Sequence, residues 1–275
     1  MIIAQITDAH MTLPGVLLFG DYDPAHALRR TLATLAAQRP RPDIVLFTGD
    51  VTENGLPAEY AAARAVLDDF DLPTAIIPGN HDRREAFVAA FAAGPARIGT
   101  GRFLHFTIED LPIRLIGLDT LFAPGESRGL LCEERLGWIA DRLAEAPDRA
   151  TAIFMHHPPF ATGIGFMDSI ACENGDRLEA LVAAHGRVLR VMCGHVHRPV
   201  LVGFGGTVAS ICPGIAYQVP LRFARTAPIE MLYQEPAFQL HVWTPETGLV
   251  THTDYLRDRM RPPAPAFPGA ASALS

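Results

Sequence analysis

Five short apolar segments, each followed by residues of the types that bind metals, constrain this chain more than any other feature. The segments are rich in β-branched residues and are bounded by polar or turn residues, which is the pattern of buried strands. They are Ile2–Ile6, Ile44–Thr48, Thr74–Pro78, Ala152–Met155 and Val188–Cys193. The motifs that follow are Asp8-Ala9-His10, Gly49-Asp50, Gly79-Asn80-His81-Asp82, His156-His157 and Gly194-His195-Val196-His197. Open α/β sheets bind ligands at this C-terminal edge of their strands, so we expect a site there.

The segments between these strands favour helices, in the βαβ rhythm of a mixed or parallel sheet. The predicted helices lie near residues 25–38, 57–69, 84–93, 132–145 and 174–185. Two further strands over 102–109 and 112–118 predict a hairpin. After His197 the pattern changes to short strands, which we expect at 199–204, 206–212, 237–244 and 249–256.

Seven side chains are candidates to converge at the strand ends. They are Asp8, His10, Asp50, Asn80, His156, His195 and His197. Seven ligands are too many for one four-coordinate zinc ion, but they suit two divalent ions that share a carboxylate. Asp50 is the candidate bridge, because it follows a strand directly and Gly49 permits close backbone approach. Nitrogen and oxygen ligands without thiolate suit Fe, Zn, Mn or Co and do not choose among them.

The motif order D-x-H, GD, GNHD, H, GHxH resembles the metallophosphoesterase superfamily. Three further segments resemble its class III cyclic-nucleotide phosphodiesterase branch and, within that branch, the bacterial glycerophosphodiesterases. These segments are Phe154–Pro159, Met167–Gly175 and Pro213-Gly214 with Gln218–Pro220. The resemblance runs from Met1 to about Pro220.

The resemblance implies an α/β fold, a four-layer αββα sandwich of two mixed sheets with a small C-terminal cap. It also implies that Asp50 bridges two ions, one bound by Asp8, His10 and His197 and the other by Asn80, His156 and His195. The implied reaction is hydrolysis of a small phosphodiester, a glycerophosphodiester or a cyclic nucleotide, by a metal-bound hydroxide. His81 would donate to the phosphate or the leaving group, and Asn80 and His195 would join it in substrate binding.

Several alternatives stay open at this stage. The enzyme could be a broad-specificity phosphomonoesterase, since the same metal core serves both reactions, or the chain could be a non-catalytic scaffold of the same fold. His81 could be structural. Asp82 could orient His81 or cap the helix that begins near Arg83. We interpret His157 as structural or as a support for the neighbouring candidate ligand His156.

Composition excludes several other functions. A net charge of −7 without a broad basic block argues against a nucleic-acid groove. No apolar run reaches the ~18 residues that span a bilayer, and the N-terminus favours a strand over a signal peptide, so we expect a cytoplasmic protein without a membrane partner. The basic residues include no lysine, which excludes a P-loop or Schiff-base lysine. The four cysteines lack CxxC spacing and are expected to be reduced thiols.

We expect four regions along the chain. Residues 1–212 form the metallophosphoesterase core, 213–236 a cap or oligomerisation segment, 237–261 strands that return to the core, and 262–275 a mobile tail. The apolar content of 213–236 predicts a homo-oligomer whose contact borders the site. Phe19, Tyr22 and residues 166–175 are candidates for pocket walls, but the sequence does not assign them a role in specificity.

Overall fold

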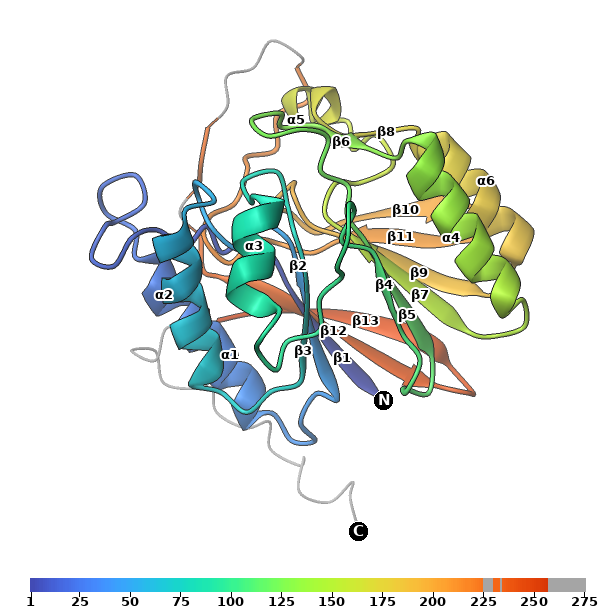
Figure 1. Ribbon diagram of the computed structural model, residues 1–275, viewed down its shortest axis with the longest axis horizontal. Helices are drawn as coiled ribbons and strands as arrows, with labels where there is room; N and C mark the ends of the chain where they lie inside the picture. Colours follow the sequence, from blue (N-terminus) through green and yellow to red (C-terminus); the bar gives the residue numbers. More distant parts are fainter. Residues whose placement is uncertain (225–229, 233, 257–275) are drawn as a thin grey trace, which may run out of the picture.

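Two stacked β-sheets form the centre of the computed structural model, which describes residues 1–224, 230–232 and 234–256 (Figure 1). The first sheet has five strands, in the order β13 (Gly248–Tyr255), β12 (Ala237–Thr244), β1 (Ile2–Ile6), β2 (Ile44–Thr48) and β3 (Thr74–Ile77). The second has six, in the order β10 (Val200–Phe204), β11 (Thr207–Ile211), β9 (Val188–Cys193), β7 (Thr151–Met155), β5 (Arg114–Leu118) and β4 (Phe106–Ile108). Both sheets are mixed, with β1–β3 parallel in the first and β5, β7, β9 and β11 parallel in the second.

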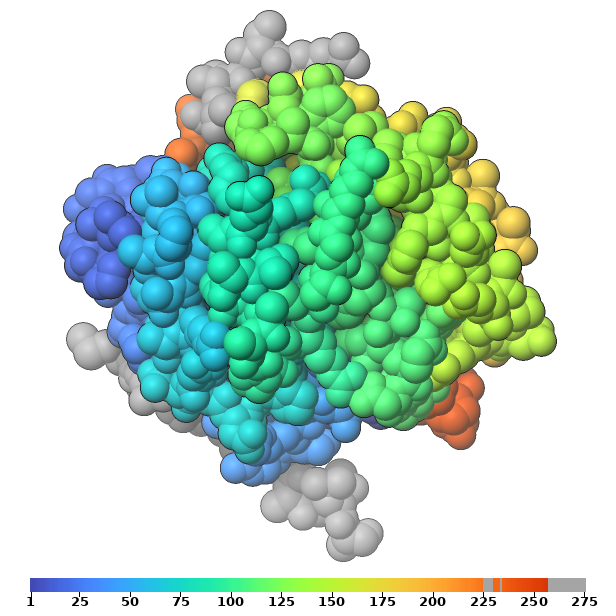
Figure 2. Space-filling model, in the orientation of Figure 1, coloured from blue at the N-terminus to red at the C-terminus, as the bar shows by residue number. Residues whose placement is uncertain are grey.

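Helices cover the outer face of each sheet. The first sheet carries α1 (Pro24–Ala37), α2 (Pro57–Asp68) and α3 (Arg84–Phe91), and the second carries α4 (Glu133–Glu145) and α6 (Gly175–His185) (Figure 1). In the space-filling view, the residues of the α2 and α3 region and of the green segment that follows pack side by side on the side of the molecule that faces the reader (Figure 2). The predicted αββα sandwich is therefore confirmed. Among the described helices, none is long and apolar enough to cross a membrane.

Three apolar cores hold these layers together. One lies between the first sheet and its helices and another between the second sheet and its helices. The third joins the two sheets and contains Ile3, Leu46, Ile77, Leu115 and Phe154 among its fully buried members. Burying such side chains from both sheets stabilises the stack by about 2 kcal/mol each.

The sequence patterns missed three short elements. They are α5 (Gly165–Ser169) and the two-residue strands β6 (Gly129–Leu130) and β8 (Cys172–Glu173), which pair with each other in parallel. Elements this short carry no readable period, so long-range packing decides them. The strand expected over 102–109 is reduced to β4, and the tail predicted over 262–275 lies outside the described residues.

Parallel register aligns the strand ends that matter for the site. Ile6 of β1 pairs with Phe47 of β2, and Phe154 of β7 pairs with Met192 of β9. The buried amide of Gln5 then links the two sheets: its Nε2 donates to Thr48 Oγ1 and to the carbonyl of Cys193, each at 3.0 Å. The C-terminal ends of β1, β2 and β9 are thereby fixed beside one another.

Candidate metal centre

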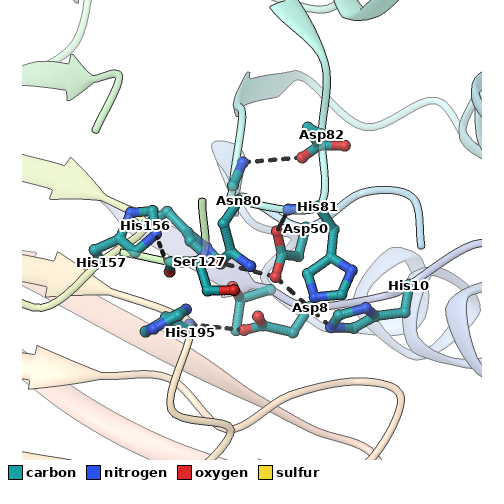
Figure 3. A network of polar contacts seen from close by, with 12 residues as sticks. Asp8, His10, Asp50, Asn80, His81, Asp82, Ser127, His156, His157 and His195 are labelled. Atoms are coloured by element: carbon teal, nitrogen blue, oxygen red, sulfur yellow. Dashed lines mark hydrogen bonds and ion pairs between the residues drawn. The ribbon is translucent and has the colours of Figure 1, made fainter. Parts of the chain in front are cut away.

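The structure brings the seven side chains predicted at the strand ends into one cluster, and Figure 3 labels all of them except His197. Asp8 and His10 follow β1, Asp50 follows β2 and Asn80 follows β3. From the second sheet, His156 follows β7, and His195 and His197 follow β9. All seven are at most 8% exposed. The centre therefore lies where the edges of the two sheets meet.

Within the cluster, ligand-type atoms lie a few ångströms apart. His197 Nε2 is 3.2 Å from Asp8 Oδ1. His156 Nε2 is 3.3 Å from Asp50 Oδ2, and His10 Nε2 is 3.8 Å from the same oxygen. Asn80 Oδ1 lies 3.1 Å from His156 Nε2. Asp50 thus stands between one histidine of the first sheet and one of the second, as a bridging carboxylate must.

Three of the histidines are oriented through their Nδ1 atoms. His10 Nδ1 lies 2.7 Å from Glu53 Oε2, His156 Nδ1 lies 2.8 Å from the carbonyl of Thr48, and His197 Nδ1 lies 2.8 Å from the carbonyl of Tyr217. Because a carbonyl or carboxylate oxygen can only accept, each Nδ1 donates. Nε2 of each ring points into the cluster, where it binds a cation once it is deprotonated, and this is how metal-binding histidines are usually held.

Two buried atoms of the cluster have no hydrogen-bond partner, Asp8 Oδ1 and His195 Nε2. Leaving a buried polar atom unpaired costs about 1–3 kcal/mol. A divalent cation in the cluster would satisfy both atoms. The residues present therefore fit metal ions, in donor type as well as in position.

The backbone is strained at the same positions. Among the described residues other than glycine, seven have a positive φ, and five of them are proposed ligands. These five are Asp8, His10, Asp50, His195 and His197, with φ between 47° and 70°. Such conformations are uncommon outside glycine and concentrate at functional sites. They turn the chain sharply as it leaves each strand and aim the side chains inward.

The charges of the cluster shift its pKa values strongly. Burial alone would raise the pKa of Asp50, but the nearby His156 and His81 outweigh burial and hold it well below its usual range. Burial would likewise lower the pKa of His156, but the charge of Asp50 prevails and raises it to about 9. Burial lowers the pKa of His195 well below its usual range, and the neighbouring rings of His157 and His156 add to this.

His81 lies at the edge of the cluster (Figure 3). Its backbone N–H donates to Asp50 Oδ1 at 2.9 Å, and its Nδ1 donates to the carbonyl of Glu53 at 2.7 Å. Burial would lower the pKa of His81, but the carboxylates of Asp50 and Glu53 outweigh burial and raise it. Nε2 is left without a hydrogen bond among the described residues, and His81 lines the pocket described below.

Both interpretations of Asp82 are wrong. Asp82 makes no bond to the His81 ring, and α3 begins after Arg83 without a side-chain cap. Instead, its buried carboxylate accepts from the backbone N–H groups of Val51, Thr52 and Gly79 and from the hydroxyl groups of Thr52 and Tyr60. Asp82 therefore fastens the loop after β2 to the loop after β3, which the sequence pattern did not indicate.

His157 makes contacts of a structural kind. Its Nδ1 lies 2.8 Å from Thr120 Oγ1, and its Nε2 lies 3.2 Å from the carbonyl of Ser127, to which it donates. His157 therefore supports the loop that brings Ser127 to the site, and neither of its ring nitrogens is left for an ion.

A pocket of about 230 Å³ opens onto the cluster. Besides residues of the cluster, its lining includes the polar residues Glu53, His81 and Ser127. The other lining residues are apolar or aromatic: Phe19, Phe166, Met167, Ile170, Tyr217, Val219 and Met231. Tyr22 instead packs away from it and donates to the carbonyl of Ile215. A larger cavity, of about 600 Å³, lies beside α2 and contains none of the seven cluster residues.

The sequence patterns missed two residues of this pocket, Glu53 and Ser127. Glu53 is three residues beyond Asp50, so its place in the same loop was a usable signal. Ser127 offered no such signal, because it follows no predicted strand. Tyr217 belongs to the segment 213–236, which the sequence analysis expected to border the site, and it does line the pocket. Tyr217 stacks on His197, with ring centroids 4.1 Å apart.

Comparison with known proteins identifies the family. The family model described as calcineurin-like phosphoesterase matches residues 1–199. The chain belongs to the calcineurin-like phosphoesterases. A relative from Arcobacter nitrofigilis named "probable glycerophosphodiester phosphodiesterase" is 37% identical over 93% of both chains. The 3′,5′-cyclic adenosine monophosphate phosphodiesterase of Escherichia coli K12 is 28% identical over 78% of this chain and 76% of its own.

Solved structures support the calcineurin-like phosphoesterase fold. A dimetal phosphatase from Danio rerio superposes with a TM-score of 0.64, covering 94% of this chain and 99% of that one. At 14% identity this likeness shows the fold alone. The residues that distinguish one member's substrate from another's must therefore be sought in the pocket walls of this chain.

Proposed function

We propose that this calcineurin-like phosphoesterase hydrolyses small phosphodiesters with two divalent metal ions. The observation that carries the proposal is the cluster itself, in which seven buried ligand-type side chains from two sheets leave Asp8 Oδ1 and His195 Nε2 without hydrogen bonds. The names of its relatives support a phosphodiester, either a glycerophosphodiester or a cyclic nucleotide.

The proposed ligand sets divide the cluster in two. Asp8, His10 and His197 offer atoms that all lie within 4.8 Å of one another and would hold the first ion. Asn80, His156 and His195 would hold the second, and Asp50 would contact both. His157 also lies near His156 and His195, but its ring nitrogens are engaged, so we assign the amide oxygen of Asn80 instead.

When bound, two divalent ions lower the pKa of water toward ~7 and offset negative charge on a phosphate. The protein's own part is orientation. The carbonyl and carboxylate partners on Nδ1 keep three histidine rings aimed inward, and Asp82 fixes the loops that carry Asp50 and Asn80. His81 is placed to donate from Nε2 to a phosphate or leaving-group oxygen. Asn80 and His195, which line the same pocket, are proposed to contact the substrate.

A side-by-side assay tests this function. Protein reconstituted with Fe, Zn, Mn or Co should approach two metal equivalents by elemental analysis. It should hydrolyse bis(p-nitrophenyl) phosphate with a higher kcat/KM than p-nitrophenyl phosphate, and we expect glycerophosphodiesters to be better substrates than cyclic AMP. A higher kcat/KM for the monoester would make the chain a phosphomonoesterase. Two bound metals without turnover of either ester would indicate a scaffold.

We further propose that the protein is a homo-oligomer. The described part of residues 213–236 includes Leu221, Phe223, Met231 and Leu232, each between 37% and 65% exposed. Clustered exposed apolar side chains of this kind often mark a contact between chains. Ile229 and Tyr233, which the sequence also suggested for this contact, lie outside the described residues.

A further inference from the structure

Glu53 is a charged residue of the pocket that the proposed ligand sets do not use. It lies in the loop after β2, and its position is fixed by its own backbone, because its N–H donates to the carbonyl of Met11 at 3.0 Å and its carbonyl accepts from His81 Nδ1 at 2.7 Å. Its Oε2 accepts from His10 Nδ1 at 2.7 Å. Two backbone hydrogen bonds thus fix the residue, and one side-chain hydrogen bond from His10 orients the carboxylate, whose Oε2 also lies 3.6 Å from His81 Nδ1.

Only one of the two carboxylate oxygens is engaged. Among the described residues, Glu53 Oε1 has no hydrogen-bond partner, the side chain is 25% exposed, and the residue lines the pocket beside the cluster. A negative charge therefore lies in the lining of the pocket in which a phosphate would bind. The apolar residues that line the same pocket, among them Phe166, Ile170 and Val219, carry no charge to balance it.

We propose that Glu53 is a specificity-determining residue whose negative charge favours phosphodiester monoanions over phosphomonoester dianions. The inference rests on the proposed function. Two divalent ions would bring four positive charges, Asp8 and Asp50 offset two of them, and Glu53 offsets a third. A diester places one negative charge in this field, whereas a monoester places two. The second charge of a monoester is repelled by Glu53, and specificity is often built from such a repulsive element.

The apolar wall acts in the same direction. A diester has a second organic group, which can cover Phe166, Ile170 and Val219, while a monoester offers that wall a charged oxygen. The two effects are separable by experiment, because replacing Glu53 with glutamine removes the carboxylate charge and leaves the apolar residues unchanged.

Glu53→Gln is the decisive variant. Glutamine keeps an oxygen that accepts from His10 Nδ1, so it preserves the ring orientation and removes only the charge. We expect the ratio of kcat/KM for p-nitrophenyl phosphate to that for bis(p-nitrophenyl) phosphate to rise on the order of tenfold, the scale of one unit charge several ångströms away in a partly screened site. Calorimetric titration with inorganic phosphate should show tighter binding to the variant, without a matching gain for dimethyl phosphate.

Two controls isolate the charge. Glu126 is next to Ser127 in the sequence, pairs with Arg128 and does not line the pocket. Glu126→Gln should therefore leave the ratio of the two kcat/KM values unchanged. p-Nitrophenyl methylphosphonate resembles the monoester in size but carries one charge, so Glu53→Gln should not improve it.

The outcomes separate the two proposals. If the wild-type protein with two metals fails to hydrolyse the diester, the proposed function is wrong. If it hydrolyses the diester but Glu53→Gln leaves both the ratio and phosphate binding unchanged, the role of Glu53 is wrong. Loss of metal from Glu53→Gln, measured by elemental analysis, would also overturn that role, because the charge would then serve the metal centre and not discrimination between substrates.

Discussion

At the scale of single residues, the site depends on side chains that are held by bonds to fixed backbone oxygens. His81 illustrates this, since the carbonyl of Glu53 receives its Nδ1–H and leaves Nε2 at the pocket. Orientation of this kind costs no further entropy when a substrate binds, which is why preorganised donors are effective in catalysis.

We therefore predict that His81→Ala retains its metals but loses roughly 10²-fold or more in kcat, the usual scale of a positioned proton donor. The measurements are turnover of bis(p-nitrophenyl) phosphate and metal content. His81→Asn is the matched control, because its amide can still donate to the Glu53 carbonyl and yet lacks Nε2. If His81→Asn recovers most of the activity, His81 is structural.

At the scale of elements, the pairing of β1 with β12 buries a histidine that must stay neutral. His241 on β12 lies 3.1 Å from Gln5 Oε1 through Nε2 and 2.8 Å from Thr251 Oγ1 through Nδ1. Burial, with a smaller effect of Arg190, lowers its pKa to about 3. An unfolded histidine titrates near 6.5, so between these two values the unfolded chain binds the extra proton. The buried, neutral His241 therefore costs no stability above pH ~6.5. Below that pH, the free energy of unfolding falls as the pH drops toward 3.

We predict that His241→Gln weakens the acid sensitivity of folding. Between pH 7 and pH 4.5, the wild-type protein should lose about 2 kcal/mol more unfolding free energy than the variant, measured by urea denaturation. The exposed His252→Gln on β13 is the control and should follow the wild type. Equal losses in wild type and His241→Gln would show that His241 does not carry this effect.

At the scale of the whole molecule, the described part of residues 213–236 has a buried portion beside the site and an exposed portion beyond it. Ile215 and Ala216 are fully buried, and their N–H groups donate to the carbonyls of Thr7 and Asp8. Leu221 and Phe223, in contrast, are 51% and 65% exposed. Deleting the whole segment would therefore damage the site itself, so the proposed oligomer contact is better tested by single substitutions beyond residue 220.

We predict that Phe223→Glu dissociates the proposed homo-oligomer at micromolar concentration, because a charge in an apolar contact is costly. Light scattering measures the change, and metal content should stay that of the wild type. Leu201→Glu, on the exposed side of β10, is the control, since Leu201 is 67% exposed and lies outside the segment. A wild-type protein that is already a monomer would refute the contact.

The sequence alone determined the principal strands of the sandwich and the position of the seven side chains at the ends of these strands. The physical reason is local. A buried strand must be apolar and β-branched, and a residue that directly follows such a strand has little freedom to be elsewhere than at the sheet's edge. Asp8, Asp50 and His156 could be placed in this way without any knowledge of how the two sheets pack.

Only the tertiary structure decided which residues surround these side chains. The packing of one sheet on the other brings His156 against Asp50 and Asn80, and the return of the chain after β11 places Tyr217 on His197. Asp82 and Glu53 form hydrogen bonds with loops about 30 to 40 residues away in the sequence, and no periodic pattern predicts a contact at that separation. Such contacts depend on the relative positions of the two sheets and their helices, which are set by the packing of the three apolar cores.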